Sequence, residues 1–337
     1  MSVTRTLLLM VVVCAATAQA PHIGHIDFYG LHKVTAEKIL QTTHMSPGGA
    51  LPPSKGDLEE EIGSISGVVA ARVEAVCCDG AAVDLFIGIE EQGAPHTAFR
   101  SAPSGSAAAP QELLDMYQDF LAAVQRAELK GTTGEDMSAG HSLMADPAVR
   151  AVEERFVTYA ANRVDLLRSV LRNGSVAEER AVAAAAIGYA SRKAEVVDDL
   201  QYAVDDPDEA VRVNAMRSLT AIGVLAQKKP DLGIKLSATW FVEMLHSVAL
   251  SDRVEAVKAL VTLTDGGNRA PLDLIRERAL PDLLEMAQWK TLRYALPPFL
   301  LLGRVAGLKD ADIHQSWEKG DRQAVIEKAM PPGRKRG

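Results

Sequence analysis

The chain has 337 residues, of which 47% are hydrophobic, 24% are charged and 5% are aromatic. This length suits two or three domains with buried cores, and the composition excludes a wholly disordered or fibrous protein. The formal net charge of −8 gives no overall basic surface for nucleic acid, and the one basic cluster, Arg334-Lys335-Arg336, lies in a short tail over 331–337.

Residues 1–18 are expected to be an export signal. Arg5 precedes an apolar run over 7–16, and small residues follow, which is the order typical of a secretory signal peptide. We expect cleavage after Ala18; cleavage after Ala20 is the alternative, although a proline would then follow the scissile bond. The apolar run is shorter than the ~20 residues that span a bilayer. The sequence therefore predicts a protein of the periplasm or cell envelope with no transmembrane segment in its mature chain.

Residues 23–92 are expected to form a small α+β domain. Alternating apolar residues over 26–30 predict a short strand, and Thr35 and Ser54 are suitable N-caps for two helices. A second pattern of alternation over 71–89 predicts a hairpin of two strands. The order of the elements is therefore strand, helix, helix, strand and strand.

The apolar faces of the expected hairpin suggest its register. A three-residue loop would pair Cys77 with Ala81 and Val73 with Leu85, which joins the two apolar faces. This register points Cys77 inward and leaves Cys78 in the loop. Because a disulfide between adjacent strand residues would be strained, we expect two thiols with no metal-binding or redox role.

The segments 26–31, 67–69 and 83–91 resemble those of a POTRA domain, and the resemblance covers about a fifth of the chain. POTRA domains are interaction modules of the cell envelope that often receive a client strand along an exposed sheet edge. The resemblance therefore implies a protein partner in the envelope. Unlike the usual members of that family, this chain has no β-barrel segment after the domain.

A change of composition marks residues 93–109. Gly, Ala, Pro and Ser dominate this stretch, most clearly over 102–109. Such sequences are typical of flexible linkers. We therefore expect two separate bodies whose relative orientation is loose.

The remainder of the chain, over 110–330, contains a repeated pattern. An arginine followed three residues later by an alanine occurs three times, as Arg180 with Ala183, Arg212 with Ala215, and Arg253 with Ala256. An apolar helix precedes each copy, so the unit is two helices with a period near 40 residues, which predicts an all-α solenoid. We expect each arginine to pair with a carboxylate between helices, such as Asp206 or Asp252.

The pattern Asp206-Pro207, then Val211-Arg212, then Ala215 resembles that of HEAT repeats. HEAT-like stacks generally present an elongated surface to a protein or peptide. The fold expected for the whole chain is therefore a POTRA-like α+β domain followed by a HEAT-like solenoid. The corresponding function is that of an exported, non-enzymatic adaptor for a protein partner in the bacterial cell envelope.

The sequence contains no phosphate-binding glycine loop, no H-E-x-x-H pattern and no nucleophile elbow, so we expect no catalytic centre, cofactor or metal. The glycine-rich loop over 131–142 nevertheless gathers acids, hydroxyls and a histidine. Its candidate functional residues are Glu135, Asp136, Ser138, His141 and Ser142. One interpretation is a binding or catalytic loop, and the other is an ordered linker whose side chains cap neighbouring helices.

Two alternatives to the adaptor remain open. Some HEAT-like proteins resemble chromophore lyases, which attach bilin pigments to acceptor proteins, although an export signal argues against that function. The other alternative is a protein that binds a small ligand or a metal through the loop over 131–142.

Overall fold

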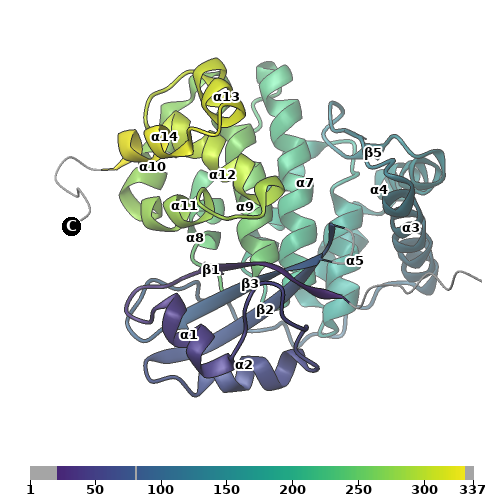
Figure 1. The fold of residues 1–337 in the computed structure, drawn as a ribbon. Helices are drawn as coiled ribbons and strands as arrows, with labels where there is room; N and C mark the ends of the chain where they lie inside the picture. The colour runs from purple at the N-terminus through teal and green to yellow at the C-terminus, as the bar shows by residue number, and fades with distance from the viewer. Residues whose placement is uncertain (1–20, 80–81, 331–337) are drawn as a thin grey trace, which may run out of the picture.

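The computed structural model describes residues 21–79 and 82–330, which form a small α+β domain followed by a helical region (Figure 1). The expected export signal and the basic tail over 331–337 lie outside the described residues. So does Ala81, and with it the expected pairing of Cys77 with Ala81.

The α+β domain has the order of elements that the sequence predicts. They are β1 (His22–Tyr29), α1 (Ala36–Thr43), α2 (Lys55–Gly63), β2 (Val68–Asp79) and β3 (Ala82–Glu91). The expected N-caps are confirmed. The hydroxyls of Thr35 and Ser54 accept hydrogen bonds from the backbone N–H groups of Lys38 and Asp57, each at 3.2 Å.

The three strands form one sheet in the order β1-β3-β2, with β1 parallel and β2 antiparallel to β3. Val73 lies opposite Ile87, so the expected pairing of Val73 with Leu85 is wrong by two residues. A shift of two keeps every side chain on its own face, which is why the apolar pattern alone did not distinguish the registers. Both Val73 and Ile87 are buried against α1 and α2, as the pattern predicted.

Cys77 differs from its prediction in two ways. It is exposed, because β2 runs on past the helices that cover the start of the sheet. It is also disulfide-bonded, so the expectation of a free thiol at this position is wrong.

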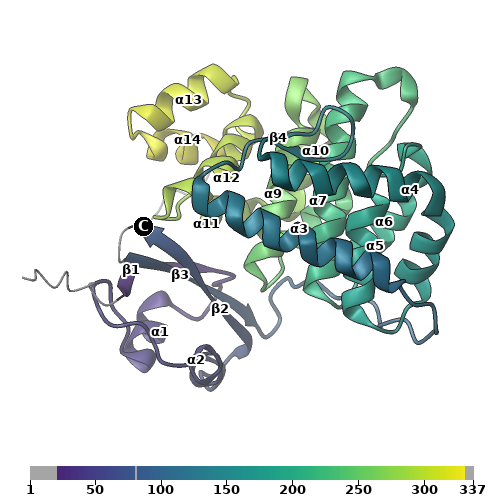
Figure 2. The ribbon, with the colours of Figure 1, turned by 90° about the vertical axis from the view of Figure 1, so that its right-hand side faces the viewer.

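The helical region contains a series of long and short helices. They are α3 (Gln111–Lys130), α4 (Pro147–Asn173), α5 (Ala177–Ile187), α6 (Val197–Val204), α7 (Glu209–Lys228), α8 (Ala238–Met244), α9 (Leu250–Leu263), α10 (Arg269–Arg278), α11 (Leu280–Met286), α12 (Leu292–Val305), α13 (Asp310–Glu318) and α14 (Arg322–Ala329). A two-stranded hairpin, β4 (Glu135–Asp136) and β5 (Leu143–Met144), interrupts the series between α3 and α4. Figure 2 shows α3 and α4 running side by side.

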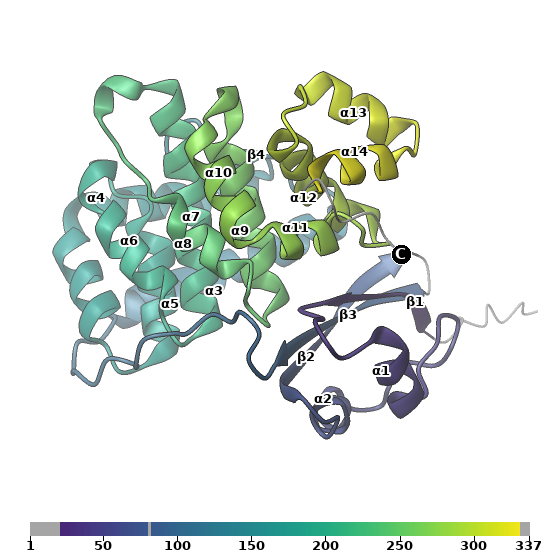
Figure 3. The same cartoon turned by 90° about the vertical axis from the view of Figure 1, so that its left-hand side faces the viewer.

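Helices α5, α7, α9 and α12 pack against one another in that order, and α6, α8 and α11 each pack on the longer helix that follows (Figures 1 and 3). Ala183, Ala215 and Ala256 are fully buried on α5, α7 and α9. Because alanine has a short side chain, neighbouring helices approach closely at these equivalent positions. The repeated sequence positions therefore have equivalent places in the structure.

Buried arginine–aspartate pairs connect the successive helices. Arg180 donates to Asp206 at 2.9 and 2.8 Å, and Arg212 donates to Asp252 at 3.0 and 2.7 Å. Both pairs follow the sequence prediction. Arg253 makes the same kind of pair with Asp282, at 3.1 Å, which the sequence analysis did not identify.

Each of these arginines also donates hydrogen bonds to backbone carbonyls just before its own helix. Arg180 donates to the carbonyls of Gly174 and Ser175, and Arg212 to those of Asp206 and Pro207. A guanidinium has five N–H donors, so it can hold its own turn and the next aspartate together. We call the three pairs, Arg180–Asp206, Arg212–Asp252 and Arg253–Asp282, the Arg–Asp series.

The sheet lies between α1 and α2 on one side and the helical region on the other (Figure 1). Phe86 of β3 is fully buried, and its ring centroid lies 5.0 Å from that of Trp289. Tyr29 lies 5.9 Å from the same indole and donates its hydroxyl to the Val248 carbonyl at 2.9 Å. Strand β3 is therefore covered on both faces, and the domain is docked on the helices.

Residues 93–109 run along the helical region. The Thr97 hydroxyl donates to the Glu243 carbonyl at 2.8 Å, Arg100 pairs with Asp206, and the Ala109 N–H donates to Glu179 at 2.7 Å. This differs from the flexible linker with loosely oriented bodies that the composition predicts. The composition of this segment shows only that it has few large apolar side chains. The contacts that hold it use backbone groups and a few polar side chains, which composition does not reveal.

Candidate functional site

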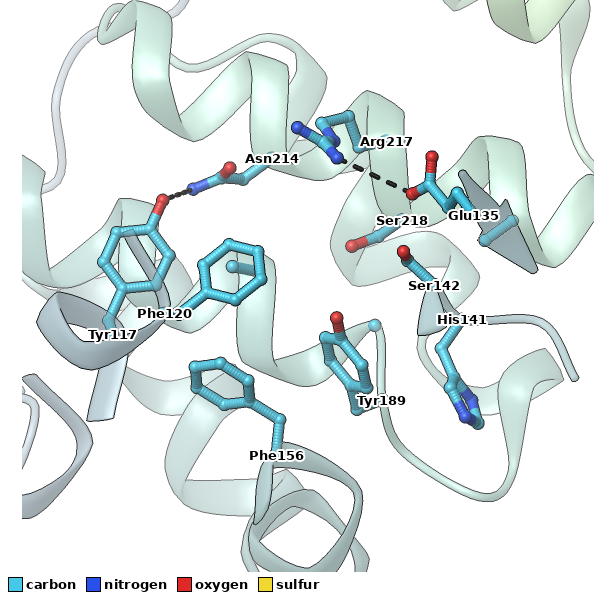
Figure 4. A pocket seen from close by; sticks show the side chains of 13 residues that line it. Tyr117, Phe120, Glu135, His141, Ser142, Phe156, Tyr189, Asn214, Arg217 and Ser218 are labelled. Atoms are coloured by element: carbon cyan, nitrogen blue, oxygen red, sulfur yellow. Dashed lines mark hydrogen bonds and ion pairs between the residues drawn. The ribbon is translucent and has the colours of Figure 1, made fainter. Parts of the chain in front are cut away.

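The loop over 131–142 divides its candidate residues between two places. Asp136 accepts a hydrogen bond from the Ser138 N–H at 2.8 Å, and bonds from this N–H and from the Ser138 hydroxyl lower the pKa of Asp136. These two residues therefore stabilise a turn. Glu135, His141 and Ser142 instead line a cavity between the β4–β5 hairpin and the helices (Figure 4).

This first cavity has a volume of about 60 Å³, which is room for a few water molecules. Aromatic rings line one side, and polar side chains of α7 line the other (Figure 4). The aromatic residues are Tyr117, Phe120, Phe156 and Tyr189, and the polar ones are Asn214, Arg217 and Ser218. Arg217 lies 3.6 Å from Glu135 at the mouth. The cavity suits water or a very small polar molecule.

Sequence reasoning missed Glu153, which anchors the hairpin. Its carboxyl group is fully buried on α4 and accepts hydrogen bonds from the Met144 N–H at 2.6 Å and the Tyr189 hydroxyl at 3.2 Å. Burial raises the pKa of Glu153 despite these bonds. The signal in the sequence is an acid within the apolar stripe that Val152 and Phe156 share on this helix.

Lys193 was also missed, and it lies beneath the same loop. Its ammonium group donates to the Gly188 carbonyl at 2.6 Å, where α5 ends, and lies 3.1 Å from Nδ1 of His141. Burial lowers the pKa of Lys193 to about 7, and burial together with Lys193 lowers the pKa of His141 to about 4. The pair holds the loop against α5, and the lowered pKa of His141 leaves its ring neutral at neutral pH.

A larger groove, of about 520 Å³, lies between the end of β2 and helices α9 and α12. Ligand sites commonly fall in the range of about 300–1,000 Å³. Apolar side chains provide most of its floor: Leu250, Val254, Val257, Met286, Tyr294, Pro297 and Pro298. Charged residues surround them: Glu74, Glu209, Glu255, Lys258 and Arg293. The groove thus has one wall from the α+β domain and the other from the helical region.

Strand β1 forms one edge of the sheet, and other parts of the chain cover it. The Ile23 N–H donates to the Gly49 carbonyl at 2.9 Å near the start of β1. Near its end, the Trp289 indole N–H donates to the Phe28 carbonyl at 3.0 Å. This edge is therefore capped at both ends by backbone and side-chain partners.

Strand β2 forms the other edge, and the residues that the structure describes cover it only in part. The Val73 N–H donates to Glu59 of α2 at 2.8 Å, and the Cys77 carbonyl accepts from Arg293 of α12 at 2.6 Å. Because these groups point away from β3, the alternation of an antiparallel strand points the N–H and carbonyl of Ala75 the same way. Ala75 is exposed and lines the groove. The open part of the edge therefore faces the groove.

Within the described residues, no cluster of three or more His, Cys, Asp or Glu side chains is arranged to hold a metal ion. In the same part of the chain, no helix is long and apolar enough to cross a membrane. No protein-family model matches the chain, and no curated protein matches it.

Proposed function

We propose that this protein is an exported, non-enzymatic adaptor of the bacterial cell envelope that binds an extended segment of a partner protein. The observation that carries the proposal is the groove of about 520 Å³ into which the open edge of β2 faces. An added strand would exchange backbone hydrogen bonds with Ala75, while its side chains would enter the apolar floor. Backbone bonds supply affinity in this mode of recognition, and side-chain pockets supply specificity.

The assignment to families belongs to the same proposal. The strand and helix order of residues 22–91 supports a POTRA-like domain, and the equivalent positions of the Arg–Asp series support HEAT-like repeats in a solenoid. Export and a location in the periplasm or cell envelope rest on the pattern of residues 1–18 alone.

Site-specific photo-crosslinking in cells tests the proposal. A photoreactive amino acid at Lys258, which lines the groove, should give a discrete crosslinked partner, whereas the same group at the exposed Lys228 of α7 should not. Ala75→Pro removes the outward N–H and should abolish the crosslink. Proline is tolerated at an edge position whose N–H lies outside the ladder, so the sheet should persist.

Ala75→Ser is the matched control, because it changes the side chain and keeps the N–H. It should crosslink as the wild type does. A crosslink from Lys258 that survives Ala75→Pro would refute strand addition, and the absence of any crosslink would refute the groove as the binding site.

The lyase and small-ligand alternatives have less support. The loop over 131–142 faces a cavity of about 60 Å³, which is far smaller than a bilin pigment needs. His141 of the loop contacts the buried Lys193 beneath it, and Lys193 in turn donates to the end of α5. The interpretation of this loop as an ordered linker is therefore the one we propose.

A further inference from the structure

A glutamate connects the end of β1 to the helical region. Oε2 of Glu285, on α11, accepts a hydrogen bond from the Gly30 N–H at 2.7 Å, and Oε1 lies 3.4 Å from the Leu31 nitrogen. Gly30 and Glu285 are 255 residues apart in the sequence. The contact helps to hold the sheet against the helices, and the sheet supplies one wall of the groove.

The cationic side chains near Glu285 pair with other groups. Arg253 of α9 pairs with Asp282 of α11 at 3.1 Å and donates to the Ser247 carbonyl at 2.6 Å. His246, before α9, also pairs with Asp282, at 3.1 Å. Within the described residues, no cation lies within ion-pair distance of Glu285.

On the side of Glu285 that faces the α+β domain, the nearby charged groups are mainly acids. Asp27 of β1 accepts from the N–H groups of Lys290 and Thr291, at distances from 2.8 to 3.0 Å. Glu37 of α1 and Lys290, which follows α11, line the same cavity as Glu285. Glu285 is therefore an acid held between two parts of the molecule mainly by neutral N–H donors.

Glu91 provides a contrast. Burial acts to raise its pKa, but three backbone N–H groups, those of residues 32–34, lower it below its usual value. For Glu285, burial raises the pKa to about 7, since the opposing effects of Arg253 and the Gly30 N–H are weaker and Asp282 adds to the rise. The two acids make similar contacts, but only Glu285 changes its protonation near neutral pH.

We propose that Glu285 makes the docking of the α+β domain on the helical region dependent on protonation. A carboxyl group that binds its proton more tightly in the docked state favours docking as pH falls, and weakens it as pH rises toward neutrality. The rise from 4.5 to about 7 corresponds to a change of two to three powers of ten in the docking equilibrium.

Hydrogen exchange at the amides of Gly30 and Leu31 measures docking directly. After correction for intrinsic exchange, their protection in the full chain should fall by a factor of about a hundred between pH 5 and pH 8. Glu285→Gln stays neutral and keeps a carbonyl oxygen as acceptor, so its protection should be nearly independent of pH. Glu277→Gln, at an exposed position on α10, should keep the wild-type dependence.

A wild-type protection that does not change with pH would overturn the proposal. So would a pH dependence that survives in Glu285→Gln and disappears in His246→Gln, because the titrating group would then be the histidine. The exchange measurement needs no partner, so its failure would leave the adaptor proposal standing. Conversely, if protection depends on pH as expected but Lys258 gives no crosslink, only the adaptor proposal is refuted.

Discussion

Acids connect the helices to one another and also connect the helical region to the α+β domain, but these acids have different partners. In the Arg–Asp series each carboxylate faces a guanidinium, which stays charged at every working pH. At the junction, Glu285 faces backbone N–H groups. The comparison separates a frame whose acids are paired with cations from a docked domain whose attachment uses an acid that faces neutral donors.

The largest effect should come from the Arg–Asp series. Arg212→Met leaves Asp252, which is fully buried, without its main partner. Breaking a buried pair on one side costs about 3–5 kcal/mol, because an uncompensated charge remains. Urea unfolding followed by circular dichroism at pH 7 should show a loss of this size.

The matched control is Arg278→Gln, which breaks a pair with Glu243 in which both side chains are more than 40% exposed. Pairs of this kind contribute roughly 0–1 kcal/mol, so this variant should unfold close to the wild type. Equal losses in the two variants would contradict the distinction between buried and exposed pairs.

A smaller effect is expected from forcing the junction apart. A methyl group added at Gly88 would lie 2.4 Å from the Tyr29 ring and 2.5 Å from the Val248 carbonyl. Gly88→Ala should therefore destabilise the docked state by about 1–3 kcal/mol and reduce the protection of the Gly30 amide, while helical circular dichroism stays the same.

Gly56→Ala is the control for that substitution. Its added methyl group meets nothing within 4 Å on α2, so it should be neutral or stabilise by about 0.4–1 kcal/mol. If Gly88→Ala destabilised the docked state no more than Gly56→Ala does, the close packing at Gly88 would not contribute to docking.

The smallest effect concerns Glu91, which holds residues 32–34 through three backbone N–H groups. Glu91→Gln should lower the free energy of unfolding by about 1–2 kcal/mol at pH 7, since the charge-assisted bonds become neutral ones. The pKa of Glu91 is below its usual value, so the wild-type advantage exists above the unfolded-state pKa and disappears as pH falls through the folded one.

Unfolding measurements between pH 7 and pH 3 check this prediction, because the wild type and Glu91→Gln should converge at the acid end. Curves that stay parallel over this range would show that the charge of Glu91 contributes nothing. Glu285→Gln should show the opposite trend, gaining on the wild type as pH rises toward neutrality.

Local features of the fold could be predicted from the sequence. Thr35 and Ser54 cap their helices because a hydroxyl just before an apolar stripe has an N–H group to bind. A carboxylate partner between helices, such as Asp206 or Asp252, could be predicted for the leading arginines, although the sequence did not show which arginine meets which aspartate.

Features that depend on distant contacts could not be predicted. Nothing around residue 285 indicates that its carboxyl group meets the end of β1, because the partner is 255 residues away and donates through its backbone. The groove was missed for the same reason, since its walls come from β2, α9 and α12. In the loop over 131–142, composition identified the polar residues but not that Asp136 and His141 serve separate purposes.

The distance between Gly30 and Glu285 along the chain also has a consequence for biosynthesis. Ribosomes add about 5–20 residues per second, so tens of seconds separate the synthesis of β1 from that of the helix on which it docks. During that interval the sheet face that carries Phe86 has no helical partner, although α1 and α2 can already cover the other face. The α+β domain is therefore completed by a helix that is made long after it, and its aromatic face needs protection from aggregation until that helix arrives.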